Sequence, residues 1–181
     1  IEKARKLYNI EHWGNDYFDI NKNGNVIVNI PGEDGKSQMV YDVKEIVDQL
    51  IEQEEIHPPM LLRFSHILKH RLAEIHSAFA NAIKTYSYTN RYQGVYPIKV
   101  NQERHVVDEI LEFGKPYQFG LEAGSKPELI LTLGAVTDDE TPILCNGFKD
   151  DEYIETVLFA RKMGRNIIPI VEKLSELHLI I

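Results

Sequence analysis

The fold is decided by residues 94–114, which read GVYPIKVNQERHVVDEILEFG. The first part of this stretch is apolar enough to form a buried β-strand, and Lys99 stands near its end. Residues 103–113 then carry apolar side chains at helical spacing, and Gly114 is a typical residue at a helix end. The stretch therefore predicts a strand that is followed directly by a helix.

The same order of strand and helix recurs towards the carboxyl end of the chain. Further strands are predicted at residues 118–122, 142–146 and 167–172. Repeated βα units with nearly continuous apolar strands indicate a parallel sheet with helices outside it. No glycine-rich dinucleotide fingerprint follows any of these strands, so half of an eightfold barrel is favoured over an open doubly wound sheet. The predicted class is α/β, as part of a (β/α)8 TIM-like barrel.

The region before the barrel has a different pattern. Two runs of alternating polarity flank the turn-forming residues 21–24, which predicts a β-hairpin. A helix is predicted to start at Asp42, with Glu45 at capping-box spacing. In chain order we expect strands at 17–20 and 25–30, a loop at 31–35, the helix after 42, a short strand at 60–64 and a long helix from 65. We predict two domains: residues 1–60 as an N-terminal hairpin and helix segment, and 61–181 as the first part of the barrel.

Composition and charge argue against several classes of function. The net charge is −8, which disfavours a sequence-independent nucleic-acid binder, because neutralising phosphates requires clustered Lys and Arg. No run approaches the ~18 apolar residues of a membrane span. Cys145 is the single cysteine, so no intrachain disulfide can form and a cytoplasmic location is expected. We also expect the chain to be a fragment of a longer protein, because it starts at Ile1 and reaches Ile181 without a helix stop signal.

Candidate functional residues stand at the predicted strand ends. In a parallel βα sheet, ligands gather at the carboxyl ends of the strands. Lys99 ends an apolar run, and a poorly hydrated lysine there would have a lowered pKa and a neutral amine able to form a Schiff base with an aldehyde. On spacing alone, a solvated lysine at a strand end is the favoured interpretation.

The residues around Lys99 resemble a motif of a known enzyme family. Tyr96-Pro97-Ile98-Lys99-Val100-Asn101 closely resembles the aromatic-x-x-Lys-x-Asn motif of the alanine-racemase-like, or fold-type III, enzymes that use pyridoxal phosphate (PLP). Its Pro-Ile-Lys-Val-Asn-Gln form is similar to that of the biosynthetic arginine decarboxylases. Further blocks agree in order with that family, at residues 120–129, 144–150 and 171–176, as do residues 13–20. The likeness spans almost the whole chain.

The resemblance implies a reaction and a site. Lys99 would hold PLP as an internal aldimine, and L-arginine would lose CO2 to give agmatine, a precursor of putrescine and spermidine in polyamine biosynthesis. Glu122, Ser125 and Asn146 are candidate cofactor-binding residues by their places in the matching blocks. Each keeps an alternative: Glu122 as a solvated or salt-bridged acid, Ser125 as a helix N-cap, and Asn146, like the nearby Lys149, as a structural residue.

The resemblance also implies parts that this sequence does not supply. The family's glycine-rich phosphate loop, its pyridine-nitrogen acid and its partner-subunit cysteine and aspartate are expected beyond Ile181, so the fragment alone is predicted to be inactive. Cys145 is predicted to be a buried thiol and not the catalytic cysteine. A homo-oligomer of complete chains is expected, and magnesium is associated with the family although no site for it is visible.

Other interpretations remain open. The intact protein could be a fold-type III decarboxylase acting on ornithine, lysine or diaminopimelate, or a non-catalytic PLP-binding barrel protein. His66 and His70 have a spacing that can hold a metal, but no Glu or Cys completes a set, so no metal site is predicted. The tyrosines between residues 86 and 96 are predicted to line the mouth of the barrel.

Overall fold

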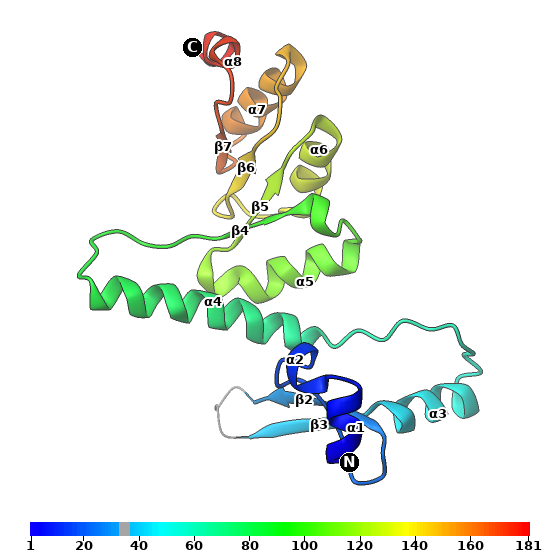
Figure 1. Cartoon of the computed structure of the whole chain (residues 1–181). Helices are drawn as coiled ribbons and strands as arrows, with labels where there is room; N and C mark the ends of the chain where they lie inside the picture. The colour runs from blue at the N-terminus through cyan, green and yellow to red at the C-terminus, as the bar shows by residue number, and fades with distance from the viewer. Residues whose placement is uncertain (33–36) are drawn as a thin grey trace. The chain divides into compact units, whose positions relative to one another are not determined.

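The structure is a computed structural model that describes residues 1–32 and 37–181 (Figure 1). It contains two compact units, residues 1–70 and 71–181. The division falls inside helix α4 (Ser65–Thr85) and not in a linker, so the domain boundary predicted after residue 60 remains a prediction.

The first unit is built on a three-stranded antiparallel sheet with strand order β1-β2-β3. Its elements are α1 (Glu2–Leu7), α2 (Ile10–Trp13), β1 (Phe18–Ile20), β2 (Val26–Pro31), β3 (Gln38–Asp42) and α3 (Val43–Gln53). The predicted hairpin is confirmed, with Ile20 paired to Val26. The Asn21 side chain closes its turn by accepting hydrogen bonds from the backbone N–H groups of Asn23 and Asn25, at 2.9 and 3.1 Å.

The predicted helix start at Asp42 is also confirmed. Its carboxylate accepts hydrogen bonds from the backbone N–H groups of Lys44 and Glu45, at 3.0 and 3.3 Å. Strand β3, which ends at this cap residue, was not predicted, because its exposed and half-buried residues show no alternation in polarity. Of the loop predicted at 31–35, Pro31 belongs to β2 and residues 33–35 lie outside the described part of the chain.

Residues 60–64, predicted as a strand, form none. This apolar run pairs with no strand of the described chain, and Phe64 instead lies with its ring 6.0 Å from that of Tyr41, centroid to centroid. An apolar run without a neighbouring strand has no partner for its backbone hydrogen bonds, which is the reason that the prediction is wrong.

The second unit holds a four-stranded parallel sheet with strand order β4-β5-β6-β7. Its strands are β4 (Val95–Pro97), β5 (Gly120–Ala123), β6 (Ile143–Cys145) and β7 (Ile167–Pro169). Helices α5 (Arg104–Gly114), α6 (Lys126–Ala135) and α7 (Asp151–Lys162) connect successive strands, α8 (Leu174–Ile180) follows β7, and short 3-10 turns occupy Ile98–Val100 (η1) and Lys115–Tyr117 (η2). The predicted succession of βα units is therefore observed, with shorter strands than expected.

The two faces of this sheet differ in burial. Leu121, Ala123, Ile143 and Cys145 point to one face and are fully buried. Helix α7 lies on that face, because its buried Tyr153 side chain lies close enough to the Cys145 thiol to influence its pKa, and its hydroxyl donates to the Ala123 carbonyl at 3.1 Å. The opposite face carries Glu122, Leu144 and Ile168, and Ile168 is 41% exposed. The helix-covered face thus supplies the core of the unit, and the other face has little cover within the described chain.

Candidate functional site

The predicted site residues come from neighbouring strands. In the sheet register Pro97 lies beside Glu122, and Glu122 lies beside Leu144. Lys99 follows β4 by two residues and Asn146 follows β6 directly. Because parallel strands end at the same edge of a sheet, the structure brings Lys99, Glu122 and Asn146 to that edge from three adjacent strands.

Lys99 lies in the turn η1 and its side chain is exposed. It makes no side-chain hydrogen bond or ion pair with any residue that the structure describes. The expectation of a poorly hydrated amine is therefore not met in this chain. The physical reason is its position. Strand β4 is an edge strand of the four, and Lys99 lies in a turn beyond its end, where no other strand of the described chain covers it. The amine is accessible to a reacting aldehyde.

Glu122 lies within β5, one residue before its end, and is half-buried. Strand alternation directs it to the sparsely covered face, between Pro97 and the apolar Leu144. Its carboxylate forms no hydrogen bond or ion pair with the described residues. A half-buried carboxylate without a partner, one strand away from Lys99, is placed to interact with a cationic group on that face.

Ser125 is the N-cap of α6, as the structural alternative predicted. Its hydroxyl accepts a hydrogen bond from the backbone N–H of Glu128 at 3.4 Å, and Glu128 Oε2 accepts one from the backbone N–H of Gly124 at 2.7 Å. These capping contacts explain why a serine stands at this position, and they require no ligand. A cofactor contact by Ser125 remains a prediction.

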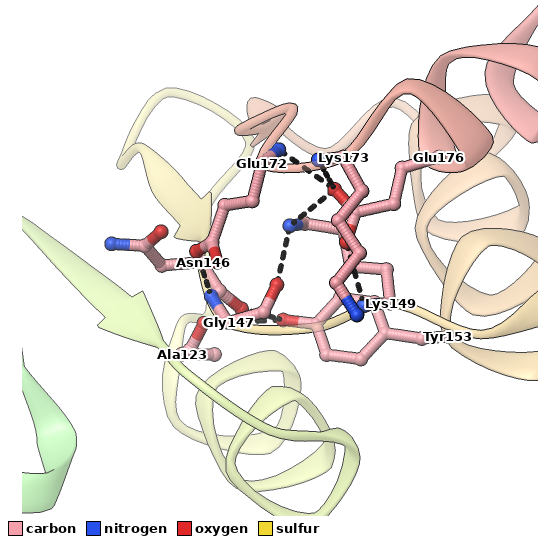
Figure 2. Close-up of polar contacts among 8 residues, drawn as sticks. All are labelled: Ala123, Asn146, Gly147, Lys149, Tyr153, Glu172, Lys173 and Glu176. Carbon is pink, nitrogen blue, oxygen red and sulfur yellow. Dashed lines mark hydrogen bonds and ion pairs between the residues drawn. The ribbon is translucent and has the colours of Figure 1, made fainter.

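Asn146 is half-buried and its backbone is tightly held. Its N–H donates to the Ala123 carbonyl at 2.8 Å, and its own carbonyl accepts from the Tyr153 hydroxyl at 3.4 Å. Figure 2 shows the Asn146 amide directed away from Lys149 and Glu176. That amide forms no hydrogen bond with the described residues and is available to a ligand.

A buried ion pair beside Asn146 is the feature that sequence reasoning missed. Lys149 Nζ lies 3.4 Å from Glu176 Oε2, and the two side chains are 0% and 1% exposed (Figure 2). Lys149 was correctly expected to be structural, but nothing assigned Glu176 as its partner. The sequence placed Glu176 at capping spacing in the last helix. That spacing indicates a contact with nearby backbone, but it does not predict an ion pair with the distant Lys149.

The Glu176 carboxylate also accepts hydrogen bonds from donors other than the Lys149 ammonium group. It accepts hydrogen bonds from the backbone N–H groups of Glu172 at 2.8 Å, Lys149 at 3.0 Å and Lys173 at 3.3 Å. These bonds, that of Glu172 foremost and followed by that of Lys149, lower the pKa of Glu176 to about 2 against the opposing effect of burial. The carboxylate therefore stays ionised at any physiological pH and joins the loops that follow β6 and β7.

Cys145 is a buried free thiol, as predicted. Burial is the main cause that raises its pKa to about 11, partly offset by the hydrogen bond with Tyr153. A protonated, inaccessible thiol is a poor nucleophile, which agrees with excluding Cys145 from a catalytic role.

The prediction that the tyrosines line the mouth is wrong for Tyr92. This residue precedes β4 and therefore lies at the amino end of the strands, where its ring stacks on Phe79 with centroids 3.7 Å apart. His76 joins the same cluster by stacking on Tyr117 at 4.4 Å. The aromatic side chains gather there because α4 supplies Phe79 and His76 on one helical face, a placement that depends on how the helix lies in the unit.

Among the described residues, no group of three or more His, Cys, Asp or Glu side chains could hold a metal ion. Nδ1 of His70, one of the two histidines with metal-like spacing, is hydrogen-bonded to the Tyr17 hydroxyl at 2.6 Å. Over the same residues, no helix is both long and apolar enough to cross a membrane.

Comparison with known proteins shows the family. Residues 72–181 match the model described as "Pyridoxal-dependent decarboxylase, pyridoxal binding domain". The chain belongs to this family. The match covers the parallel sheet with Lys99, Glu122, Ser125 and Asn146, and so includes every predicted site residue.

Individual relatives of this family resemble the chain along its length. A biosynthetic arginine decarboxylase of Pelobacter propionicus is 50% identical over 98% of the chain, and one of Citrifermentans bemidjiense is 51% identical over 100% of it. The chain spans only 27% and 28% of the length of these two relatives. It therefore corresponds to about a quarter of such a protein.

Two solved structures agree with the fold. The crystal structure of the biosynthetic arginine decarboxylase SpeA from Campylobacter jejuni matches with a TM-score of 0.82 and 37% identity, over 96% of this chain and 28% of that chain. A diaminopimelate decarboxylase from M. jannaschi matches at a TM-score of 0.54 and 20% identity, over 93% of this chain and 32% of that chain, which shows likeness of fold alone. The predicted fold class, part of a decarboxylase barrel, is confirmed.

Proposed function

We propose that the intact protein decarboxylates L-arginine to agmatine and CO2 with PLP as cofactor, as a step of polyamine biosynthesis. The observation that carries this proposal is the identity of about one residue in two with biosynthetic arginine decarboxylases, over essentially the whole chain. The structure of SpeA supports the same substrate.

The residues at the sheet edge fit this cofactor. Lys99 offers an exposed amine without a competing partner in the described chain, which is what covalent attachment of an aldehyde requires. From the next two strands, Glu122 and Asn146 offer a carboxylate and an amide that have no partner among the described residues. PLP, when bound, supplies the electron sink that accepts the electron pair left by the departing CO2.

Each of these residues has a role in the proposal. Lys99 holds the cofactor through Nζ and exchanges a proton at that atom. Glu122 places a negative charge on the face where a cationic group would lie. Asn146 orients the cofactor through its amide, and Ser125 adds a hydroxyl beside the start of α6. The proposal also includes a homo-oligomer of complete chains in the cytoplasm. Magnesium binding is an expectation that comes from the resemblance alone.

The test is a substrate comparison on the intact protein. Release of CO2 would be measured with arginine, ornithine, lysine and diaminopimelate, and arginine should be preferred by a wide margin. Preference for another of the four amino acids would change the proposed substrate, but the protein would still be assigned as a decarboxylase. Cofactor absorbance without CO2 from any of them would indicate a non-catalytic PLP-binding protein instead.

The attachment residue is tested separately. Borohydride reduction of the cofactor-loaded protein, followed by peptide mapping, should label Lys99. Labelling of a different lysine, or of none, would remove Lys99 from the site whatever the substrate.

A further inference from the structure

The peptide bond between Asn146 and Gly147 is held mainly at its N–H. This N–H, from Gly147, donates to Glu172 Oε1 at 2.7 Å. The carbonyl, from Asn146, lies 3.4 Å from the Tyr153 hydroxyl, whose shorter hydrogen bond is to the Ala123 carbonyl at 3.1 Å. A peptide unit is planar, so the bond at the Gly147 N–H limits its rotation. The N–H of Asn146 is also bound, to Ala123 at 2.8 Å. The backbone on both sides of the Asn146 α-carbon is therefore restrained, and its side-chain amide has no hydrogen-bond partner among the described residues (Figure 2).

Glu172 is itself held by the buried ion pair. Its backbone N–H donates to Glu176 Oε2 at 2.8 Å, and Glu176 in turn accepts from Lys149. Lys149 Nζ donates to the Gly147 carbonyl at 2.6 Å. Gly147 is the residue whose N–H binds Glu172. Gly147, Glu172, Glu176 and Lys149 thus form a closed ring of contacts that joins the loops after β6 and β7.

The loop inside this ring also has no room to shift towards β5. Gly147 has a φ of +75°, and a Cβ at this position would lie 2.1 Å from the Gly124 carbonyl oxygen. The loop therefore packs directly on the backbone that follows β5, and rotation of the peptide is its remaining freedom. The Glu172 carboxylate, on an exposed residue, removes that freedom.

We infer that Glu172 is a positioning residue that orients the Asn146 amide for the cofactor, acting through the N–H of Gly147. This inference rests on the proposed function, in which Asn146 contacts PLP. Glu172 itself binds the backbone of the loop, and the proposal gives it no direct contact with the cofactor. The Lys149–Glu176 pair fixes the backbone from which Glu172 reaches the loop.

A double-mutant cycle on the intact protein tests the inference. The apoprotein of wild type, Glu172→Ala, Asn146→Ala and the double variant would be titrated with PLP and the affinity read from cofactor absorbance. Each single change should weaken PLP binding by about threefold to tenfold, the range for loss of one ordinary hydrogen bond. If Glu172 acts through Asn146, then Glu172→Ala should cost nothing more in the Asn146→Ala background.

Two variants separate positioning from general stability. Glu172→Gln keeps an oxygen that can accept from Gly147 and should bind PLP like the wild type. Lys126→Met removes the exposed ion pairs of Lys126 with Asp150 and Glu152 in the same region, and should also leave PLP affinity unchanged. Loss of affinity in either would point to a nonspecific effect and contradict the inference.

Hydrogen exchange in the apoprotein gives a readout that needs no cofactor. The amide of Gly147 should exchange faster in Glu172→Ala than in wild type, and at the wild-type rate in Glu172→Gln. Additive losses of affinity in the cycle, or no loss in Asn146→Ala, would overturn the inference. None of these measurements uses arginine, so an error in the proposed substrate would leave their outcome intact and would appear only in the CO2 assay.

Discussion

Lys149 and Glu176 lie 27 residues apart in sequence, and their charged groups meet at 3.4 Å with almost no exposure to solvent. The pair links the loop after β6 to the first turn of α8. Burying two charges is unfavourable unless they are paired and hydrogen-bonded, and here the backbone N–H groups around Glu176 supply the additional donors. Removing one partner leaves the other charge buried without its counter-ion.

Substitution of Lys149 should therefore destabilise the protein strongly. Lys149→Met keeps the length of the side chain and removes its charge, and should lower the melting temperature of the intact protein by roughly 5–10 °C. Lys126→Met, which breaks an exposed cluster at the same end of the sheet, should lower it by no more than about 2 °C. Thermal unfolding followed by circular dichroism compares the two, and equal shifts would contradict the difference in burial.

The pKa of Glu176 predicts where acid weakens the fold. Its folded pKa of about 2 lies below the ordinary 4.5, so the carboxylate contributes stability that is complete above pH 4.5 and is lost as the pH falls towards 2. Glu176→Gln should therefore be less stable than wild type at pH 6, and the gap should narrow between pH 4.5 and 2. Urea unfolding at a series of pH values measures this, and a gap independent of pH would refute the assignment.

Gly147 and Gly24 form a matched pair, because both have positive φ but only one is crowded. At Gly24 (φ +85°) nothing lies within 4 Å of an added Cβ, whereas at Gly147 (φ +75°) the Gly124 carbonyl oxygen would lie at 2.1 Å. Gly24→Ala should cost about 1 kcal/mol of unfolding free energy, from backbone strain alone. Gly147→Ala should cost at least about 2 kcal/mol and weaken PLP binding. Similar costs in denaturant unfolding would show that the loop yields to the methyl group.

The buried Cys145 thiol should resist modification. Its pKa of about 11, against 9.0 for an ordinary cysteine, lowers the thiolate fraction at neutral pH by about a hundredfold, before burial of the sulfur is considered. Alkylation of the native protein at pH 8 should be slower than that of the urea-unfolded protein by at least this factor. Mass spectrometry of the labelled peptide measures both rates, and rapid native labelling would mean that α7 opens away from β6.

The local elements of this protein follow from its sequence. The Asn21–Gly24 turn, the Asp42 and Ser125 caps and the order of βα units were all predicted, because each depends on neighbouring residues and on the spacing of apolar side chains. The block around Lys99 also indicated the family. Strand β3 escaped prediction because an exposed strand carries no pattern in its own residues and is defined by its neighbour β2.

Only the tertiary structure decided which groups are paired and which are free. It places Glu176 against Lys149, joins Glu172 to Gly147 and leaves the side chains of Lys99, Glu122 and Asn146 without partners in the described chain. It also moves Tyr92 to the amino end of the strands and leaves Lys99 exposed beyond an edge strand. These properties depend on contacts between residues distant in sequence, and spacing along the chain does not encode burial or pairing across such distances.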